Sequence, residues 1–129
     1  MADRSADWLA QAERDLEMAR LALNAAIFEW ACFVAQQAAE KAVKGLYESL
    51  HGTTRGHSVS QLLQLLPNEA APANDLIEMA KILDQYYIPA RYPNGFDVGA
   101  PKDYYTREAT ATALENAKAI VGFYRSMVP

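Results

Sequence analysis

The stretch that decides the fold is QQAAEKAVKG, residues 36–45. It lies in the middle of a strongly helical pattern with apolar residues on both sides of it. Its polar groups occupy positions that a simple amphipathic helix would leave apolar. We therefore expect the helix over residues 28–50 to be contacted on more than one side, with a role for its polar cluster.

Small side chains recur along this helix at spacings of four and three residues. They are Ala31, Ala35, Ala38, Ala42, Gly45 and Ser49. Such a seam lets another helix approach closely, at the shallow crossing angle of bundle helices. The partner helix belongs either to the same chain or to a second copy in a dimer, and the sequence leaves both alternatives open.

A polar row, formed by Gln37, Glu40 and Lys44, follows the seam on an adjacent face. Glu40 and Lys44 are spaced for an i,i+4 ion pair, which stabilises an exposed helix by only a few tenths of a kcal/mol. If the row is instead enclosed between helices, each charge needs a partner, because burying it alone costs several kcal/mol.

Four further helices are predicted besides the helix over residues 28–50. Apolar spacing indicates helices from Trp8 to Leu23, over residues 58–66, over residues 72–87 with Pro72 in the first turn, and from Thr106 onward. The sequence contains no strand-like alternation. The predicted fold class is therefore all-α: an up-and-down helical bundle of four main helices plus one short helix, in a single domain over residues 1–129.

Composition limits the classes of function. The chain has 129 residues, 51% hydrophobic and 22% charged, which fits one globular domain with its own core. Its net charge of −4 gives no global positive field, so a nucleic-acid site would have to be a local patch. The single cysteine, Cys32, is expected to be a buried structural residue. With acidic residues near the start and no apolar run of about 20 residues, we expect a cytoplasmic protein without membrane contact.

The connection over residues 89–105 contains prolines and glycines that exclude a continuous helix. Five of the seven tyrosines fall between positions 86 and 105, which argues against disorder. Arg91 lies among them, next to Tyr92 and close to Tyr87. It either binds a phosphate or stacks on a base, or it holds the loop by bonding backbone carbonyls or a carboxylate.

Four segments together resemble the HEPN domain family (higher eukaryotes and prokaryotes nucleotide-binding). They are the opening helix from Trp8 to Ala19, FVAQQAAEKAVK at residues 33–44, GHS at residues 56–58, and LDQYYIPARYP at residues 83–93. The resemblance covers nearly the whole chain. It implies a helical bundle that is commonly a homodimer, interaction with a nucleotide or RNA, and pairing with a minimal nucleotidyltransferase, often as a toxin–antitoxin system.

The chain departs from the family at one motif. HEPN ribonucleases carry an Arg followed after four to six residues by a His, a pair suited to metal-independent RNA cleavage. Arg91 lies in a similar region, but Phe96, Asp97 and Val98 stand where the His is expected. The only histidines are His51 and His57, and His57 either caps or packs at the next helix or approaches Arg91 through folding. We therefore assign no catalytic residue, and Arg91 and His57 remain the candidates.

The leading hypothesis is a binding module, a nucleotidyltransferase partner in a toxin–antitoxin-like pair. Its nucleotide or phosphate site is predicted to comprise Arg91, Tyr92, Tyr87, Lys41 and Lys44. One alternative is a ribonuclease that uses Arg91 with His57, and another is a structural dimer without a ligand. No cofactor or metal is expected, because one Cys and two His are too few for zinc and no Gly-rich phosphate loop is present. Carboxylates such as Asp75, Glu78 and Asp84 fit a solvated helix face.

Overall fold

The computed structural model describes residues 3–127 of the chain. Its five α-helices are α1 (Ser5–Asn24), α2 (Phe28–Ser49), α3 (Val59–Gln64), α4 (Asn74–Asp84) and α5 (Arg107–Met127). Residues 3–127 contain no β-strand. Because α3 is the one short helix, the structure confirms the predicted all-α bundle of four main helices and a short one.

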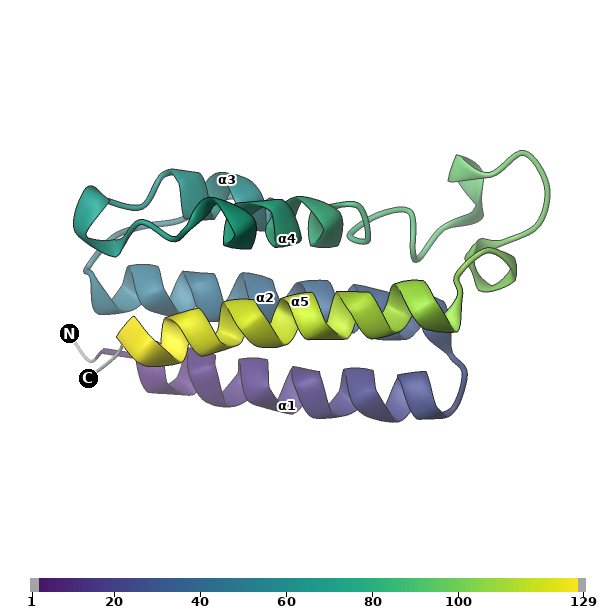
Figure 1. Cartoon of the computed structure of the whole chain (residues 1–129), viewed down its shortest axis with the longest axis horizontal. Helices are drawn as coiled ribbons and strands as arrows, with labels where there is room; N and C mark the ends of the chain where they lie inside the picture. Colours follow the sequence, from purple (N-terminus) through teal and green to yellow (C-terminus); the bar gives the residue numbers. More distant parts are fainter. Residues whose placement is uncertain (1–2, 128–129) are drawn as a thin grey trace.

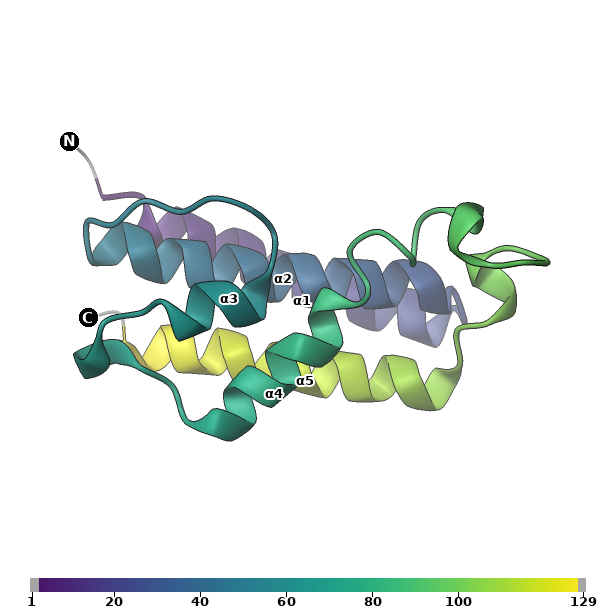
Figure 2. The ribbon, with the colours of Figure 1, turned by 90° about the horizontal axis from the view of Figure 1, so that it is seen from above.

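The helices are arranged in three layers (Figure 1). α1 forms one outer layer, α2 and α5 form the middle one, and α3 and α4 cover the opposite side. The four main helices alternate in direction along the chain, which is the predicted up-and-down order. Seen from above, α4 runs obliquely across α5 (Figure 2). The start of α1 and the end of α5 meet at one end of the bundle, where the Tyr124 hydroxyl donates a hydrogen bond to the Ser5 carbonyl.

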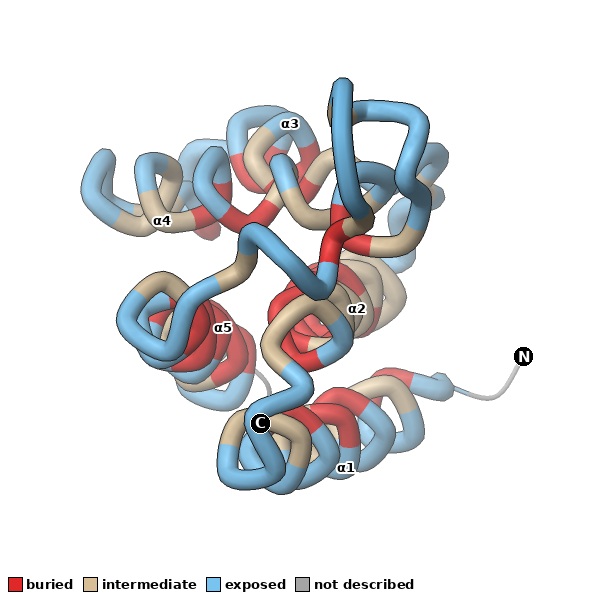
Figure 3. Tube along the Cα trace, turned by 90° about the vertical axis from the view of Figure 1, so that its right-hand side faces the viewer, coloured by how far each residue is buried: buried red, intermediate tan, exposed pale blue. Residues whose placement is uncertain are grey.

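The core gathers where α1, α2 and α5 face one another, as the view along the bundle shows (Figure 3). The alanines of the small-residue seam on α2 are fully buried within the chain. At Gly45 a Cβ atom would lie 2.7 Å from both Trp8 Cβ and Tyr124 Oη. The seam therefore packs inside the monomer against α1 and α5, which decides between the two alternatives left open by the sequence. Cys32 is also fully buried, as predicted.

Two predicted boundaries of α4 were wrong. Pro72 precedes the helix, because Ala73 has the extended backbone of a helix-capping residue (φ −65°, ψ 156°). Tyr87 lies beyond the end of the helix at Asp84. Pro89 sets an outer limit on the helix, because proline disfavours helical backbone in the residue before it and cannot donate to the helical ladder. The helix ends several residues before that limit.

The long connection between α4 and α5 extends past the end of the bundle (Figure 1). It contains two single 3-10 turns, Pro93–Gly95 and Pro101–Asp103, and no continuous helix, as predicted. Ala90 and Pro101 are buried and hold it to the rest of the molecule. None of the helices within residues 3–127 has the length and hydropathy that crossing a bilayer requires.

The close approach at Gly45 leads to a stability prediction. We expect Gly45→Ala to lower the free energy of unfolding by about 1–3 kcal/mol, because the new methyl group would overlap Trp8 and Tyr124. Gly122→Ala on α5 is the matched control, since apart from the adjoining residues and backbone of its own helix no atom lies within 4 Å of its new Cβ. There the higher helix propensity of alanine should raise stability by about 0.5–1 kcal/mol. Urea unfolding measures both, and a Gly45→Ala protein as stable as wild type would contradict the packing described.

Candidate functional site

Asp84, the last residue of α4, joins α4 to the start of α3. Its carboxylate accepts hydrogen bonds from the backbone N–H groups of Val59 (2.6 Å) and Ser60 (3.2 Å). It also accepts from the hydroxyls of Ser58 (3.0 Å) and Ser60 (2.5 Å). The positive end of the helix dipole also stabilises a carboxylate at the helix N-terminus. The sequence analysis placed Asp84 on a solvated helix face, and this prediction was wrong. Asp84 instead fixes the segment before α3 next to the turn after α4.

His57 precedes this capped helix, and Tyr87 follows Asp84 by three residues, so the Asp84 contacts bring the two rings together. The imidazole of His57 stacks on the phenol ring of Tyr87, with centroids 4.2 Å apart and planes 17° apart. The His57 side chain keeps 49% of its surface exposed. The fold thus places His57 against the turn that leads to Arg91, the approach that the sequence alone could not show.

Glu40, in the middle of α2, is the anionic centre of the site. Its side chain is only 7% exposed and has three polar partners. It accepts from Gln36 Nε2 at 3.1 Å and from Lys44 Nζ at 3.0 Å, while His57 Nδ1 lies 3.1 Å from each carboxylate oxygen. Gln36 also donates to the His57 backbone carbonyl at 3.1 Å. The polar row is therefore enclosed, and Glu40 has the partners that a buried charge requires.

These contacts set the charge of Glu40 and the orientation of His57. Burial would raise the pKa of Glu40, but the hydrogen bonds from Gln36, Lys44 and His57 outweigh it and lower the pKa below its ordinary value of 4.5. A carboxylate only accepts, so the Nδ1 of His57 carries the proton of that hydrogen bond. In the neutral ring the other nitrogen, Nε2, then has a free lone pair.

Arg91 packs over several aromatic rings. Its guanidinium carbon lies 4.4 Å from the ring centroid of Phe33, 4.7 Å from that of Tyr87 and 5.3 Å from that of Tyr92. Its Nε donates to the Tyr87 carbonyl at 2.7 Å. Arg91 therefore fixes the turn, as one of the two predicted alternatives stated. In the described part of the chain no carboxylate lies within ion-pair distance of it, so its charge is not neutralised there.

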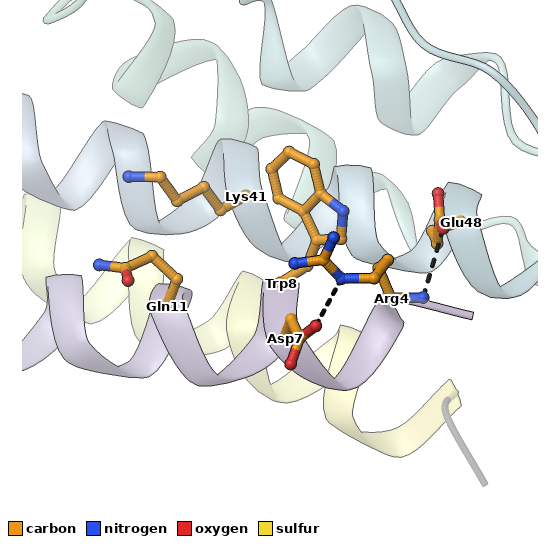
Figure 4. A pocket seen from close by; sticks show the side chains of 6 residues that line it. All are labelled: Arg4, Asp7, Trp8, Gln11, Lys41 and Glu48. Atoms are coloured by element: carbon orange, nitrogen blue, oxygen red, sulfur yellow. Dashed lines mark hydrogen bonds and ion pairs between the residues drawn. The ribbon is translucent and has the colours of Figure 1, made fainter. Parts of the chain in front are cut away.

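The two predicted lysines lie in different surroundings. Lys44 pairs with Glu40 and is part of the site described above. Lys41 instead pairs with Asp15 of α1 at 2.5 Å and borders a hollow of about 400 Å³ between α1 and α2 (Figure 4). Arg4 and Trp8 also line that hollow. The fold therefore brings Tyr87, Arg91, Tyr92 and Lys44 to one region and directs Lys41 toward α1.

Three residues of this site were not among those predicted for it, although Glu40 had been noted in the polar row. Phe33 supports the Arg91 guanidinium, Glu40 orients His57, and Asp84 holds α3 against α4. The i,i+4 spacing of Gln36, Glu40 and Lys44 was a readable signal for the polar contacts along α2. Nothing in the sequence linked Glu40 to His57 or Asp84 to Ser58, because these contacts depend on how the helices pack. Within residues 3–127 no three His, Cys, Asp or Glu side chains cluster closely enough to hold a metal ion.

The fold and these residues define a helical-bundle protein with a His–Glu pair beside an aromatic-stacked arginine. The HEPN domain family matches residues 5–127, and the chain belongs to that family. The chain is similar to the crystal structure of TT1696 from Thermus thermophilus, with 42% identity and a TM-score of 0.95 over 98% of this chain and 100% of that one.

Two further solved structures are similar. One is ST0689, an archaeal HEPN homologue, with 41% identity and a TM-score of 0.84 over 99% of this chain and 100% of that one. The other is an HEPN domain protein, tm0613, from Thermotoga maritima, with 29% identity and a TM-score of 0.76 over 93% of this chain and 95% of that one. No curated protein matches the chain. The resemblance to the HEPN family is thereby confirmed.

The enclosed Glu40 makes stability depend on pH. Its folded-state pKa is lowered, so its contribution is complete above about pH 4.5 and is lost as the pH falls through the folded-state value. We expect Glu40→Gln to lower the free energy of unfolding by about 1–3 kcal/mol near pH 7, because Lys44 and His57 lose their charged acceptor. The difference in the free energy of unfolding between Glu40→Gln and wild type should become smaller toward about pH 3.5, because Glu40 of the wild type becomes protonated there.

Urea unfolding at both pH values provides the measurement. Glu115→Gln, which removes a carboxylate from an exposed pair with Lys118, is the matched control and should change stability by less than about 0.5 kcal/mol. Equal effects of the two substitutions near pH 7 would show that Glu40 is not enclosed as described.

Proposed function

We propose that the chain is a cytoplasmic HEPN binding module that holds a phosphate-bearing ligand, a nucleotide or a single strand of RNA, at Arg91. The observation that carries the proposal is the position of the Arg91 guanidinium, stacked on Phe33 and Tyr87 and without a carboxylate partner in the described residues. Because Nε is held by the Tyr87 carbonyl, the terminal nitrogens of the guanidinium remain available to a phosphate.

Several neighbours support this ligand class. Arg91, Lys102 and Glu29 all line a small hollow of about 190 Å³, a size that suits a phosphate group rather than a whole nucleotide. Lys102 is paired with Asp103 at 3.0 Å, so Arg91 is the cation on which this site depends. Tyr92 lies beside the arginine and is exposed, so its ring is free to stack on a base. In this proposal Lys44 acts indirectly, because it neutralises Glu40 and helps to hold His57 next to Tyr87.

Binding measurements test the proposal. We expect saturable binding of ATP or a short single-stranded RNA by calorimetry, and a loss of about 10- to 100-fold in affinity for Arg91→Ala, as expected for charge-assisted hydrogen bonds. Arg20→Ala, at an exposed position on α1, is the control and should bind as wild type does. Circular dichroism checks that Arg91→Ala still folds, since Arg91 also holds the turn. If wild type shows no saturable binding, the binding proposal is contradicted and the alternative of a structural dimer without a ligand is supported.

A second function, metal-independent RNA cleavage, is favoured by the contact between Glu40 and His57. With Nδ1 directed at Glu40, Nε2 of a neutral His57 can take the proton of a ribose 2′-hydroxyl, whose oxygen then attacks the adjacent phosphorus. The bond from phosphorus to the 5′-oxygen breaks, and the imidazolium returns its proton to that leaving oxygen. Arg91 would stabilise the charge on the phosphate.

Cleavage of a labelled RNA without added metal separates this function from binding alone. We expect His57→Ala to reduce the rate by about 100-fold or more if the imidazole moves the proton, with His51→Ala unchanged. A 2′-deoxy substitution at the cleaved nucleotide should stop the reaction. Binding without cleavage at any enzyme concentration would support the binding module and contradict the nuclease.

A nucleotidyltransferase partner, in a toxin–antitoxin-like pair, is a further part of the proposal. It rests on the resemblance of residues 33–44 and 83–93 to HEPN proteins that work with such enzymes. A gene for a small nucleotidyltransferase next to this one, and co-purification of the two products, would support it.

We also propose a homodimer, formed through the end of α1 and the start of α2. Large apolar side chains are exposed there: Leu21 is 63% exposed and Trp30 48%, and Met18 and Ile27 lie beside them. These residues line an apolar hollow of about 380 Å³. A surface of this kind fits a second copy of the chain, because soluble monomers rarely expose contiguous apolar patches.

Oligomeric state measured by light scattering tests the dimer. We expect wild type to be dimeric and Leu21→Glu to be monomeric, because the new charge would be buried in the contact. Leu65→Glu, at a 67% exposed position after α3, is the matched control and should stay dimeric. A monomeric wild type would contradict the dimer, and a dimeric Leu21→Glu protein would place it on another surface.

A further inference from the structure

A cleft of about 530 Å³ lies between the turn after α4 and the last part of the long connection. Four aromatic rings line it, with Gln85 and Pro89 at its border; the rings are those of Tyr86, Phe96, Tyr104 and Tyr105. The site described above does not use any of these rings. Their concentration in one hollow accounts for most of the tyrosine cluster found in the sequence.

The four rings form two pairs. Phe96 and Tyr104 stack with centroids 4.5 Å apart and planes 8° apart, and Tyr86 and Tyr105 pack at 5.6 Å and 57°. Burial raises the pKa of Tyr86 and raises that of Tyr105 to about 12, so both hydroxyls stay protonated at neutral pH. The walls of the cleft therefore offer uncharged aromatic faces, which suit a flat aromatic ring.

The cleft and the Arg91 region belong to the same turn. Tyr86 lines the cleft and the next residue, Tyr87, carries the stacked His57 and Arg91. Pro89 borders the cleft, and Arg91 follows two residues later. Arg91 itself lines a second hollow, together with Ala90, and Ala90 directly follows Pro89 of the cleft. The Cα atoms of consecutive residues are about 3.8 Å apart, so the two hollows adjoin along this turn. A nucleotide has the matching chemistry, because it joins a flat base to an anionic phosphate.

We propose that this cleft holds a nucleobase whose phosphate binds Arg91. The inference rests on the proposed function and adds a second point of contact to it. The base packs against the two aromatic pairs, and the Gln85 amide, which offers both a donor and an acceptor, contacts its edge. The ligand is then bound by base and phosphate together, either as a free nucleotide or as one unit of a single-stranded RNA.

The test uses a 2′-O-methyl RNA trinucleotide with 2-aminopurine at its centre, a fluorescent base that is quenched when it stacks. We expect wild type to quench and bind it, and Phe96→Ala and Tyr104→Ala to weaken binding by about 5- to 100-fold, the effect of removing a stacking ring. Leu65→Ala, at a 67% exposed position after α3 that does not line the cleft, is the control and should bind as wild type does. Circular dichroism confirms that each variant folds.

Two further ligands separate the sources of the base. The first is free 2-aminopurine riboside 5′-monophosphate. If it binds as tightly as the trinucleotide, the cleft is a site for a free nucleotide. If the trinucleotide binds much more tightly, the cleft is a site for RNA. A trinucleotide abasic at its centre should bind at least about 5-fold more weakly.

The outcomes distinguish this inference from the proposed function. Arg91-dependent binding without quenching, or with no effect of Phe96→Ala and Tyr104→Ala, overturns the base site and leaves the phosphate site intact. Quenching that depends on Phe96 and Tyr104 but not on Arg91 supports the base site and contradicts the phosphate site. No binding of any RNA or nucleotide overturns both. Binding of N-acetyltryptophanamide to the cleft, with no quenching of the RNA probe, would assign it to an aromatic side chain of a protein partner.

Discussion

The constraint on which the site depends is the enclosure of Glu40 within the central helix. A carboxylate that is 7% exposed must be hydrogen-bonded, and its partners come from two directions. Gln36 and Lys44 lie one turn away on the same helix, and His57 comes from the segment before α3. The backbone carbonyl of His57 is held by Gln36 as well, so the histidine is fixed through both its ring and its main chain.

The opposite side of His57 is fixed by α4. Asp84 caps α3 and ends α4, and the chain then turns so that Tyr87 stacks on the imidazole and Arg91 lies over Tyr87 and Phe33. The turn after α4 therefore brings together the imidazole of His57, the guanidinium of Arg91 and the aromatic ring of Tyr87. In HEPN ribonucleases the histidine follows the arginine along the chain, whereas here His57 comes from an earlier segment and shares only the Tyr87 ring with Arg91.

Much of the fold could be predicted from the sequence. Apolar spacing located the five helices, and the polar stretch flanked by apolar residues indicated that α2 is contacted on more than one side, because both features depend on residues close together in the chain. The end of α4 was misplaced, since Leu83 and Tyr87 fit one helical stripe although the helix ends at Asp84. The site was only partly predictable: Arg91 and Tyr87 stood out by type, but the roles of Glu40 and Asp84 depend on contacts between helices that share no sequence signal.

The most direct test of this account is the tautomer of His57, read by nitrogen NMR of the protein labelled at its two histidines. At a pH where the ring is neutral, we expect Nδ1 of His57 to carry the proton and Nε2 to carry none, because Nδ1 faces the Glu40 carboxylate. His51, which is exposed, provides the internal reference. A His57 ring protonated at Nε2, or one indistinguishable from His51, would show that Glu40 does not hold His57 through Nδ1.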